Sequence, residues 1–161
     1  MTGVALDIRS ILDPIRAHAS SLGLYDQVAQ HEPKRAPGSG LTFAMWVDRV
    51  NPIPSSGLAS TSVRVTVLGR IYGPMLAEPQ DDIDPRMTDA AAAFIVALAG
   101  DLELNGPDGS GASVARSIDV RGIHGIDLSA QAGYITQDHA LYRVYTITVP
   151  VLVNDVYDEA R

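Results

Sequence analysis

The sequence predicts an α+β fold, with an antiparallel sheet of four to five strands and two helices packed on it. Three observations predict this class. Residues 62–72 alternate apolar and polar, an apolar stripe of helical spacing follows Asp84-Pro85, and residues 134–155 read as a strand, a polar turn and a long second strand. The chain has 161 residues, of which 46% are hydrophobic, so we expect a single domain over residues 1–161.

The first 22 residues have the spacing of one helix face. Gly23 follows at the position of a left-handed cap. Pro14 conflicts with a continuous helix, because an internal proline removes a hydrogen bond and costs about 3 kcal/mol. We expect either a kink there or a helix that begins near Asp13-Pro14. The apolar positions are Val4, Ile8, Ile11, Leu12, Ile15, Ala19 and Leu22.

A loop and two strands are expected next. Residues 31–40 are rich in glycine and proline and predict a loop, and Leu41–Val50 reads as a strand around Phe43, Met45 and Trp46. Residues 51–57 read as a turn or loop. Gly69, inside the second strand, predicts a bulge or a close approach by another backbone. That strand should bury Val63, Val65, Val67 and Ile71 and leave Arg64, Thr66 and Arg70 in water.

The second helix has the clearest local signals. Asp84 suits an N-cap, Pro85 suits the first helical position, and Gly100 is expected to end the helix. Phe94 lies mid-stripe and should be a central core residue. The stripe consists of Met87, Ala91, Phe94, Ile95 and Leu98.

The last third of the chain predicts a loop, a strand and a hairpin. Asn105–Gly111 is a flexible loop, and the alternation through Val114, Arg116, Ile118 and Val120 indicates a strand. Tyr134-Ile135 and Leu141–Val153 form the hairpin, with Asp138-His139 at its tip. The loops 30–40 and 105–111 carry little apolar surface, so we expect both to be mobile in the free subunit.

Charge and composition exclude several classes of protein. The net charge is −7, and Lys34 is the single lysine, which disfavours tight binding to nucleic-acid phosphates. The chain has no cysteine, so disulfides and thiolate metal sites are excluded. The N-terminus does not read as a signal peptide, and no apolar stretch is long enough to span a membrane.

No motif points to catalysis, a metal or a cofactor. Asp81, Asp82 and Asp84 lack the pattern of a calcium loop and read as helix capping and solvated charge. His124 and His139 lie near Asp127 and Asp138, but neither a nucleophile elbow nor a zinc motif accompanies them, so they read as surface or turn residues. The glycine-rich segments 38–40 and 106–111 lack the ending of a phosphate loop and read as connectors. Tyr142 and Tyr145 differ by three along a strand and should face opposite sides of the sheet, which argues against a shared stacking platform.

Several segments together carry a resemblance to a known family. They are Val63–Tyr72, Ile83-Asp84-Pro85 with its helix, Ile118–Gly125, Gly133-Tyr134-Ile135 and Tyr142–Asp155. In this arrangement the chain resembles the tail-terminator proteins of long-tailed, siphovirus-type bacteriophages, especially those of actinobacteria. The likeness covers about two-thirds of the chain, and no matching residue is catalytic in that family.

The resemblance implies a structural virion protein of the tail and neck, assembled in the cytoplasm of the host bacterium, without enzymatic activity or cofactor. It implies a homohexameric ring that caps the head-proximal end of the tail tube, ends tube polymerisation and binds the tail tube protein and a neck protein. DNA would pass through the lumen without specific binding. The candidate assembly contacts are Lys34, Arg35, Arg70, Tyr72, Asn105, Asp108, Asn154 and Asp155. Another phage neck or tail-tube ring protein, and a small ligand-binding domain or enzyme, remain alternatives.

Overall fold

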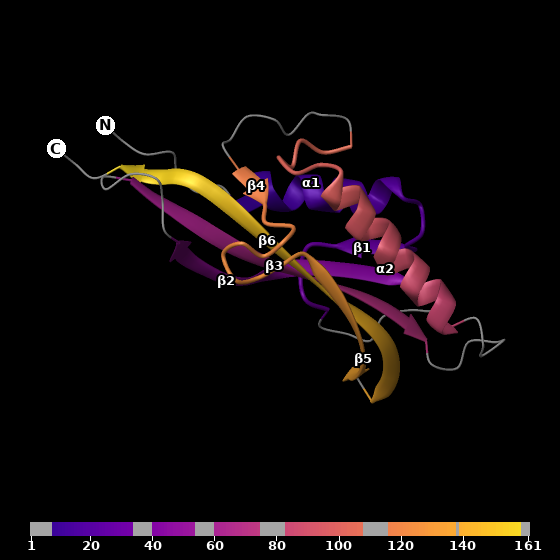
Figure 1. Ribbon diagram of the computed structural model, residues 1–161. Coiled ribbons are helices and arrows are strands. Elements are labelled where there is room, and N and C mark those ends of the chain that lie inside the picture. Colours follow the sequence, from indigo (N-terminus) through magenta and orange to yellow (C-terminus); the bar gives the residue numbers. More distant parts are fainter. Residues whose placement is uncertain are drawn as a thin grey trace.

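The computed structural model describes residues 8–33, 40–53, 60–74, 83–107, 116–137 and 139–158, which form two helices and six strands (Figure 1). The helices are α1 (Ile8–Ser21) and α2 (Ile83–Ala99). The strands are β1 (Gln27–Ala29), β2 (Thr42–Ile53), β3 (Ser60–Pro74), β4 (Arg116–Ile118), β5 (Ser129–Gln137) and β6 (Ala140–Asp158).

The sheet is mixed, which corrects the expected purely antiparallel sheet. Its order is β1-β2-β3-β6-β4, and β5 pairs with β6 beside β4. The pairs β2–β3, β3–β6, β4–β6 and β5–β6 are antiparallel, but β1 runs parallel to β2, with Gln27 opposite Thr42. Because the two strands are parallel, β2 begins at the end of the sheet at which β1 begins. A strand of three residues is too short to show a period in the sequence, so β1 was missed.

Strand lengths also differ from the prediction. β2 continues through Asn51-Pro52-Ile53, which were expected in a loop. β4 ends at Ile118, before Val120, and Val114 lies outside the described residues. The hairpin is confirmed. Gln137 pairs with Ala140, and His139 between them has a φ of 65°, while Asp138 lies outside the described residues.

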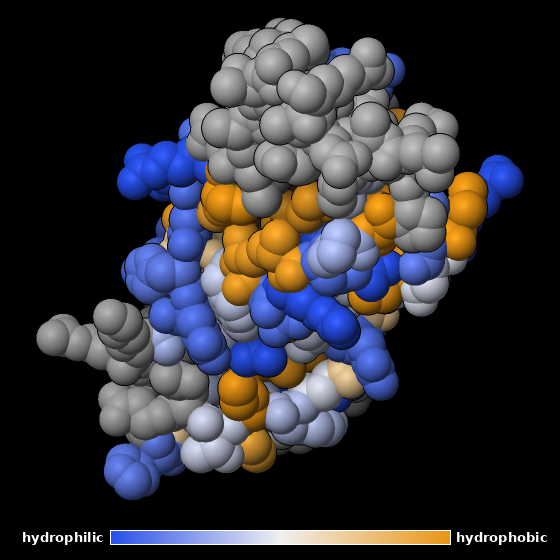
Figure 2. Space-filling view, turned by 90° about the vertical axis from the view of Figure 1, so that its left-hand side faces the viewer, coloured by the Kyte–Doolittle hydropathy of each residue, from blue (hydrophilic) through white to orange (hydrophobic). Residues whose placement is uncertain are grey.

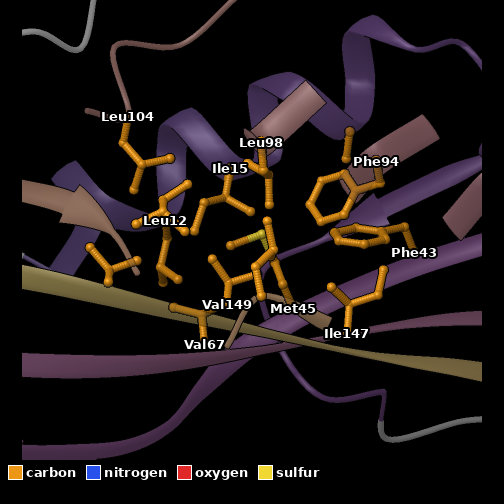
Figure 3. Packing of buried hydrophobic residues seen from close by; sticks show 14 of the residues in the cluster. Leu12, Ile15, Phe43, Met45, Val67, Phe94, Leu98, Leu104, Ile147 and Val149 are labelled. Carbon is orange, nitrogen blue, oxygen red and sulfur yellow. The ribbon is translucent and has the colours of Figure 1, made fainter. Parts of the chain in front are cut away.

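Both helices lie on one face of the sheet, and the core fills the space between the two layers (Figures 1 and 3). Phe94 of α2 is fully buried, which confirms the predicted stripe. Its ring centroid lies 4.8 Å from that of Phe43 on β2, and the ring of Tyr25 packs 5.2 Å from Phe43 on another side. Ile15 of α1 and Val67 of β3 close the same layer (Figure 3). We call this the helix face of the sheet, and its opposite the outer face.

The ends of the helices follow local chemistry. α1 runs through Pro14, so it does not begin there, and the proline ring is buried. Gly23 caps the helix with a φ of 66°, and its amide donates to the carbonyl of Ser20 at 3.3 Å, as predicted. α2 begins at Ile83, one residue before the predicted cap, and Pro85 lies in the first turn, where no backbone donor is required. The α-helix ends at Ala99, and the Gly100 amide bonds to the carbonyl of Val96 at 3.0 Å.

The outer face of β3 is more buried than the alternation predicted. Arg64 and Thr66, which were expected in water, are 8% and 4% exposed, and Arg70 is half-buried. Residues 119–128 explain part of this, because this segment leaves the sheet between β4 and β5 and the carbonyl of His124 accepts a hydrogen bond from Arg64 Nη1 at 2.7 Å. On the helix face, a Cβ at Gly69 would lie 3.0 Å from Cζ of Phe43. The predicted close approach at Gly69 is therefore to a side chain rather than to a backbone.

Candidate interaction surfaces

The predicted contact residues fall into three groups. Lys34, Arg35 and Asp108 lie outside the described residues. Asn154 and Asp155 belong to β6 by their backbone, while their side chains lie outside the described set. Arg70, Tyr72 and Asn105 are fully described, and the structure brings the first two together and places the third elsewhere.

Arg70 and Tyr72 belong to an aromatic cluster on the outer face. The Arg70 guanidinium carbon lies 5.3 Å from the ring centroid of Trp46 and 5.9 Å from that of Tyr72. The ring of Tyr72 meets the ring of Tyr142 edge-on, with 6.2 Å between centroids. Tyr145 packs instead against the helix-face core, so Tyr142 and Tyr145 face opposite sides as predicted. Tyr72 is itself buried within the subunit, so Arg70 and Trp46 are the more accessible members of this cluster.

Asn105 belongs to a fixed turn rather than to a free loop. The carboxylate of Asp101 accepts hydrogen bonds from the amides of Asn105 and Gly106 at 2.9 and 2.8 Å and pairs with Nε2 of His18 at 2.7 Å. Burial acts to raise the pKa of Asp101, but the hydrogen bond from His18, the two amides and the charge of His18 together lower it below its usual value. This pair joins residues 83 positions apart, and the sequence offered no signal for it.

The edge of β2 carries features that block strand addition. β1 covers Thr42–Ala44 alone, so no described strand pairs with the outer edge of β2 from Met45 onward. A bulge between Val47 and Arg49 interrupts the register there, and Pro52 follows. Charge, proline and bulges are the usual means by which proteins protect a sheet edge.

The residues of β5 themselves supply none of these protections, and the charged Arg143 of β6 bonds to the β5 backbone, where its Nη1 donates to the carbonyl of Gly133 at 3.2 Å. β5 pairs with β6 over all nine of its residues, and no described strand pairs with its other edge. The strand reads Ser-Ala-Gln-Ala-Gly-Tyr-Ile-Thr-Gln, without a charge or a proline. An unprotected edge of this length is a template for pairing with another chain.

Exposed apolar side chains lie beside that edge, at the tip of the β5–β6 hairpin. Tyr134 and Leu141 are 61% and 51% exposed. The guanidinium carbon of Arg143 lies 4.5 Å from the ring centroid of Tyr134 and orients it. In Figure 1 this hairpin extends away from the rest of the sheet. Tyrosine and arginine are enriched in protein interfaces, so the hairpin tip is a candidate contact surface.

The long strand β6 is an interior strand of the sheet. β3 borders one side of it from Tyr142 to Asp158, and β5 and β4 border the other side in succession. Its final residues pair with the start of β3.

Figure 2 looks onto the side of the molecule that is at the left of Figure 1, where hydrophobic patches border strongly hydrophilic ones.

Among the residues that the structure describes, the histidines and acids singled out from the sequence do not gather into a site, while Asp81, Asp82 and Asp138 lie outside the described residues. His124, His139 and Asp127 are exposed, as surface or turn residues should be. Within the described ranges, no group of three or more His, Asp or Glu side chains is placed to hold a metal ion. Neither described helix is long and apolar enough to cross a membrane.

No protein-family model and no curated protein sequence matches the chain. Among solved structures, the chain is similar to the sheath/tube terminator of PVC, an extracellular contractile injection system, seen by cryo-EM in its extended state. The two share 10% sequence identity, and the TM-score is 0.44. The match covers 98% of this chain and 61% of the terminator chain, so this chain spans less than two-thirds of the length of the terminator. A likeness this distant assigns no function to the chain.

Proposed function

We propose that this chain is a tail-terminator subunit, and that six copies close into a ring on the head-proximal end of a phage tail tube. The sequence supports this through its resemblance to siphovirus-type terminators. In the structure, the supporting observation is the unprotected outer edge of β5 beside the exposed Tyr134 and Leu141. A surface of this kind is costly in a monomer and is explained by a partner that covers it.

A ring, unlike a two-fold dimer, requires that the β5 hairpin bind a different surface of the neighbouring subunit. A ring forms when one surface of a subunit binds a different surface of the next and the rotation closes. The open β5 edge lies on one side of the sheet and the protected β2 edge on the other. The β5 hairpin of one subunit would bind a neighbour elsewhere than at β2, and a stable contact would bury more than about 1,000 Å².

The finer parts of the proposal follow the resemblance. The ring ends tube polymerisation, binds the tail tube protein on one side and a neck or head-completion protein on the other, and lets DNA pass without specific binding. Lys34, Arg35, Asp108, Asn154 and Asp155 are proposed contacts for these partners. Arg70, with Tyr72 behind it, is a proposed contact on the outer face, and Asn105 one on the turn after α2.

Assembly of the purified chain tests the proposal. Native mass spectrometry should find a six-membered species, and negative-stain images should show a ring. Gln131→Lys with Thr136→Lys places charges at exposed positions of β5 and should dissociate the ring. Val96→Lys is a control, because Val96 is 70% exposed on α2, and its ring should persist.

Two results would contradict the proposal. A chain that stays monomeric at high concentration and binds a metabolite would favour the ligand-binding alternative. A phage without this protein that still made tails of normal length joined to full capsids would exclude a terminator role, since loss of a terminator leaves tubes of uncontrolled length.

A further inference from the structure

Arg64 is a buried cation with little compensation inside the subunit. Its side chain lies on the outer face of β3 and is 8% exposed. Nη1 donates to the carbonyl of His124 at 2.7 Å, while Nε is buried without a hydrogen-bond partner. Arg64 makes no ion pair with any described residue. A buried guanidinium with one neutral acceptor has lost most of its hydration, which is a substantial cost unless an anion accompanies it.

Two further buried polar atoms without partners lie beside Arg64. Asn51 is its cross-strand partner on β2, and Asn51 Oδ1 has no hydrogen-bond partner. Thr66, two residues along β3 on the same face, has a buried hydroxyl that likewise lacks one. Directly opposed residues of an antiparallel pair have Cβ atoms about 4.5–5.5 Å apart. The three atoms therefore belong to one small patch of the outer face.

The β2 bulge adds a second cation to this patch. Before the bulge Val47 pairs with Val67, and after it Arg49 pairs with Thr66, so Arg49 faces outward. Arg49 is exposed and lies diagonal to Arg64, a relation that places Cβ atoms about 7–8 Å apart. Asp48, the extra residue of the bulge, is exposed and forms no ion pair with either arginine.

We propose that Arg49 and Arg64 form a binding site for a carboxylate on a polypeptide segment. The two guanidinium groups bind the carboxylate oxygens, as planar donors of this kind do. Asn51 and Thr66 border the two arginines on the same face of the sheet.

The occupant is an acidic segment of a second copy of this chain. The chain has 19 acidic and 12 basic residues, so every copy carries a net negative charge. The two arginines are positively charged and therefore attract the acidic residues of another copy. This part of the inference rests on the self-assembly proposed above, while the carboxylate site itself does not. Duplex DNA is the less suitable occupant, because Arg64 is too buried to meet a continuous phosphate backbone.

Acetate titration of the full chain tests the site directly, with NaCl added to hold ionic strength constant. The Arg64 Nε–H resonance, assigned by its loss in Arg64→Met, should shift and saturate in wild type. At about ten times its dissociation constant, acetate should raise the melting midpoint by roughly 3–6 °C. Arg49→Met should weaken acetate binding severalfold. The variant should remain folded, because Arg49 is exposed on β2. Arg86→Met, an equal charge change at an exposed position of α2, should leave the titration unchanged.

Measuring assembly of the variants tests whether a second copy of the chain binds at this site. Arg49→Met should lower the fraction of assembled chain at least tenfold at low micromolar concentration, and Arg86→Met should not. If acetate shifts the Arg64 resonance but assembly is unaffected by Arg49→Met, the second copy is not the occupant and that part of the inference is wrong. If acetate has no more effect on wild type than on Arg49→Met, the carboxylate site is wrong. A shift of the resonance by a short DNA duplex but not by acetate would also overturn it. A chain that never assembles would refute the ring and the second copy together, whereas the acetate result would still decide the site.

Discussion

Truncation of Phe94 to alanine should destabilise the protein by about 3–5 kcal/mol, the usual range for removing a fully buried phenylalanine. Phe94 has no exposed surface, and its ring lies 4.8 Å from Phe43 at an interplanar angle of 53°. A tilted aromatic pair contributes about 0.5–1.5 kcal/mol beyond buried area, which places the expected loss in the upper part of the range. The cavity would open between α2 and β2, where Phe94 meets Phe43 (Figure 3). The ring of Tyr25 also packs on Phe43 and restricts collapse.

Urea unfolding of wild type and Phe94→Ala measures this loss. The midpoint should fall while the denaturant slope stays constant, because the same surface is exposed on unfolding. For a domain of this size the melting temperature should drop by roughly 6–20 °C. Val96→Ala is the control on the same helix, since Val96 is 70% exposed and its truncation should change stability by less than about 0.5 kcal/mol. A loss at Phe94 no larger than that of the control would show that α2 does not pack as described.

Three further changes test separate parts of the fold. Gly69→Ala should cost about 1–3 kcal/mol in a melting experiment, because its Cβ would lie 3.0 Å from a Phe43 ring that is held on both sides, and no loss would contradict that packing. His139→Gly should stabilise by about 1 kcal/mol, since His139 has a φ of 65° and Asp-Gly suits a two-residue hairpin turn; a destabilised variant would mean another turn geometry. The pKa of Asp101 is lowered in the folded state, so its contribution to stability is present above about pH 4 and lost as pH falls through the folded-state pKa. Asp101→Asn should flatten the acid limb of the stability profile and speed hydrogen exchange at the Asn105 amide, and an unchanged profile would contradict the pairing.

Sequence patterns predicted the helices and strands that bury one apolar face against the core. The apolar stripe around Phe94 and the alternation of Val65 and Val67 needed only the helical and strand periods, and both are confirmed. Gly23 was predictable as a cap because a left-handed residue ends many helices. The hairpin of β5 and β6 followed from two apolar runs separated by a short polar pair. These features depend on neighbours within about ten residues.

Features that depend on distant partners were not predictable. Arg64 looked solvent-exposed because alternation gives the face of a side chain but not what covers that face, here the carbonyl of His124. The pairing of His18 with Asp101 joins α1 to the turn after α2, and no local pattern marks either residue. Arg70 was proposed from the sequence, but its position between Trp46 and Tyr72 depended on strand register.

The bulge in β2 connects the two proposed surfaces. A strand with unbroken alternation would turn Arg49 and Asn51 toward the helix face, because a one-residue shift moves every later side chain to the opposite side of the sheet. With Asp48 inserted, both residues face outward beside Arg64, and the same insertion disrupts the free edge of β2 against strand addition. One extra residue thus supplies a cationic patch on the outer face and leaves β5 as the long, uncharged edge. If neighbours associate through the β5 hairpin, β2 is free to present its arginines to an acidic segment rather than its backbone to another strand.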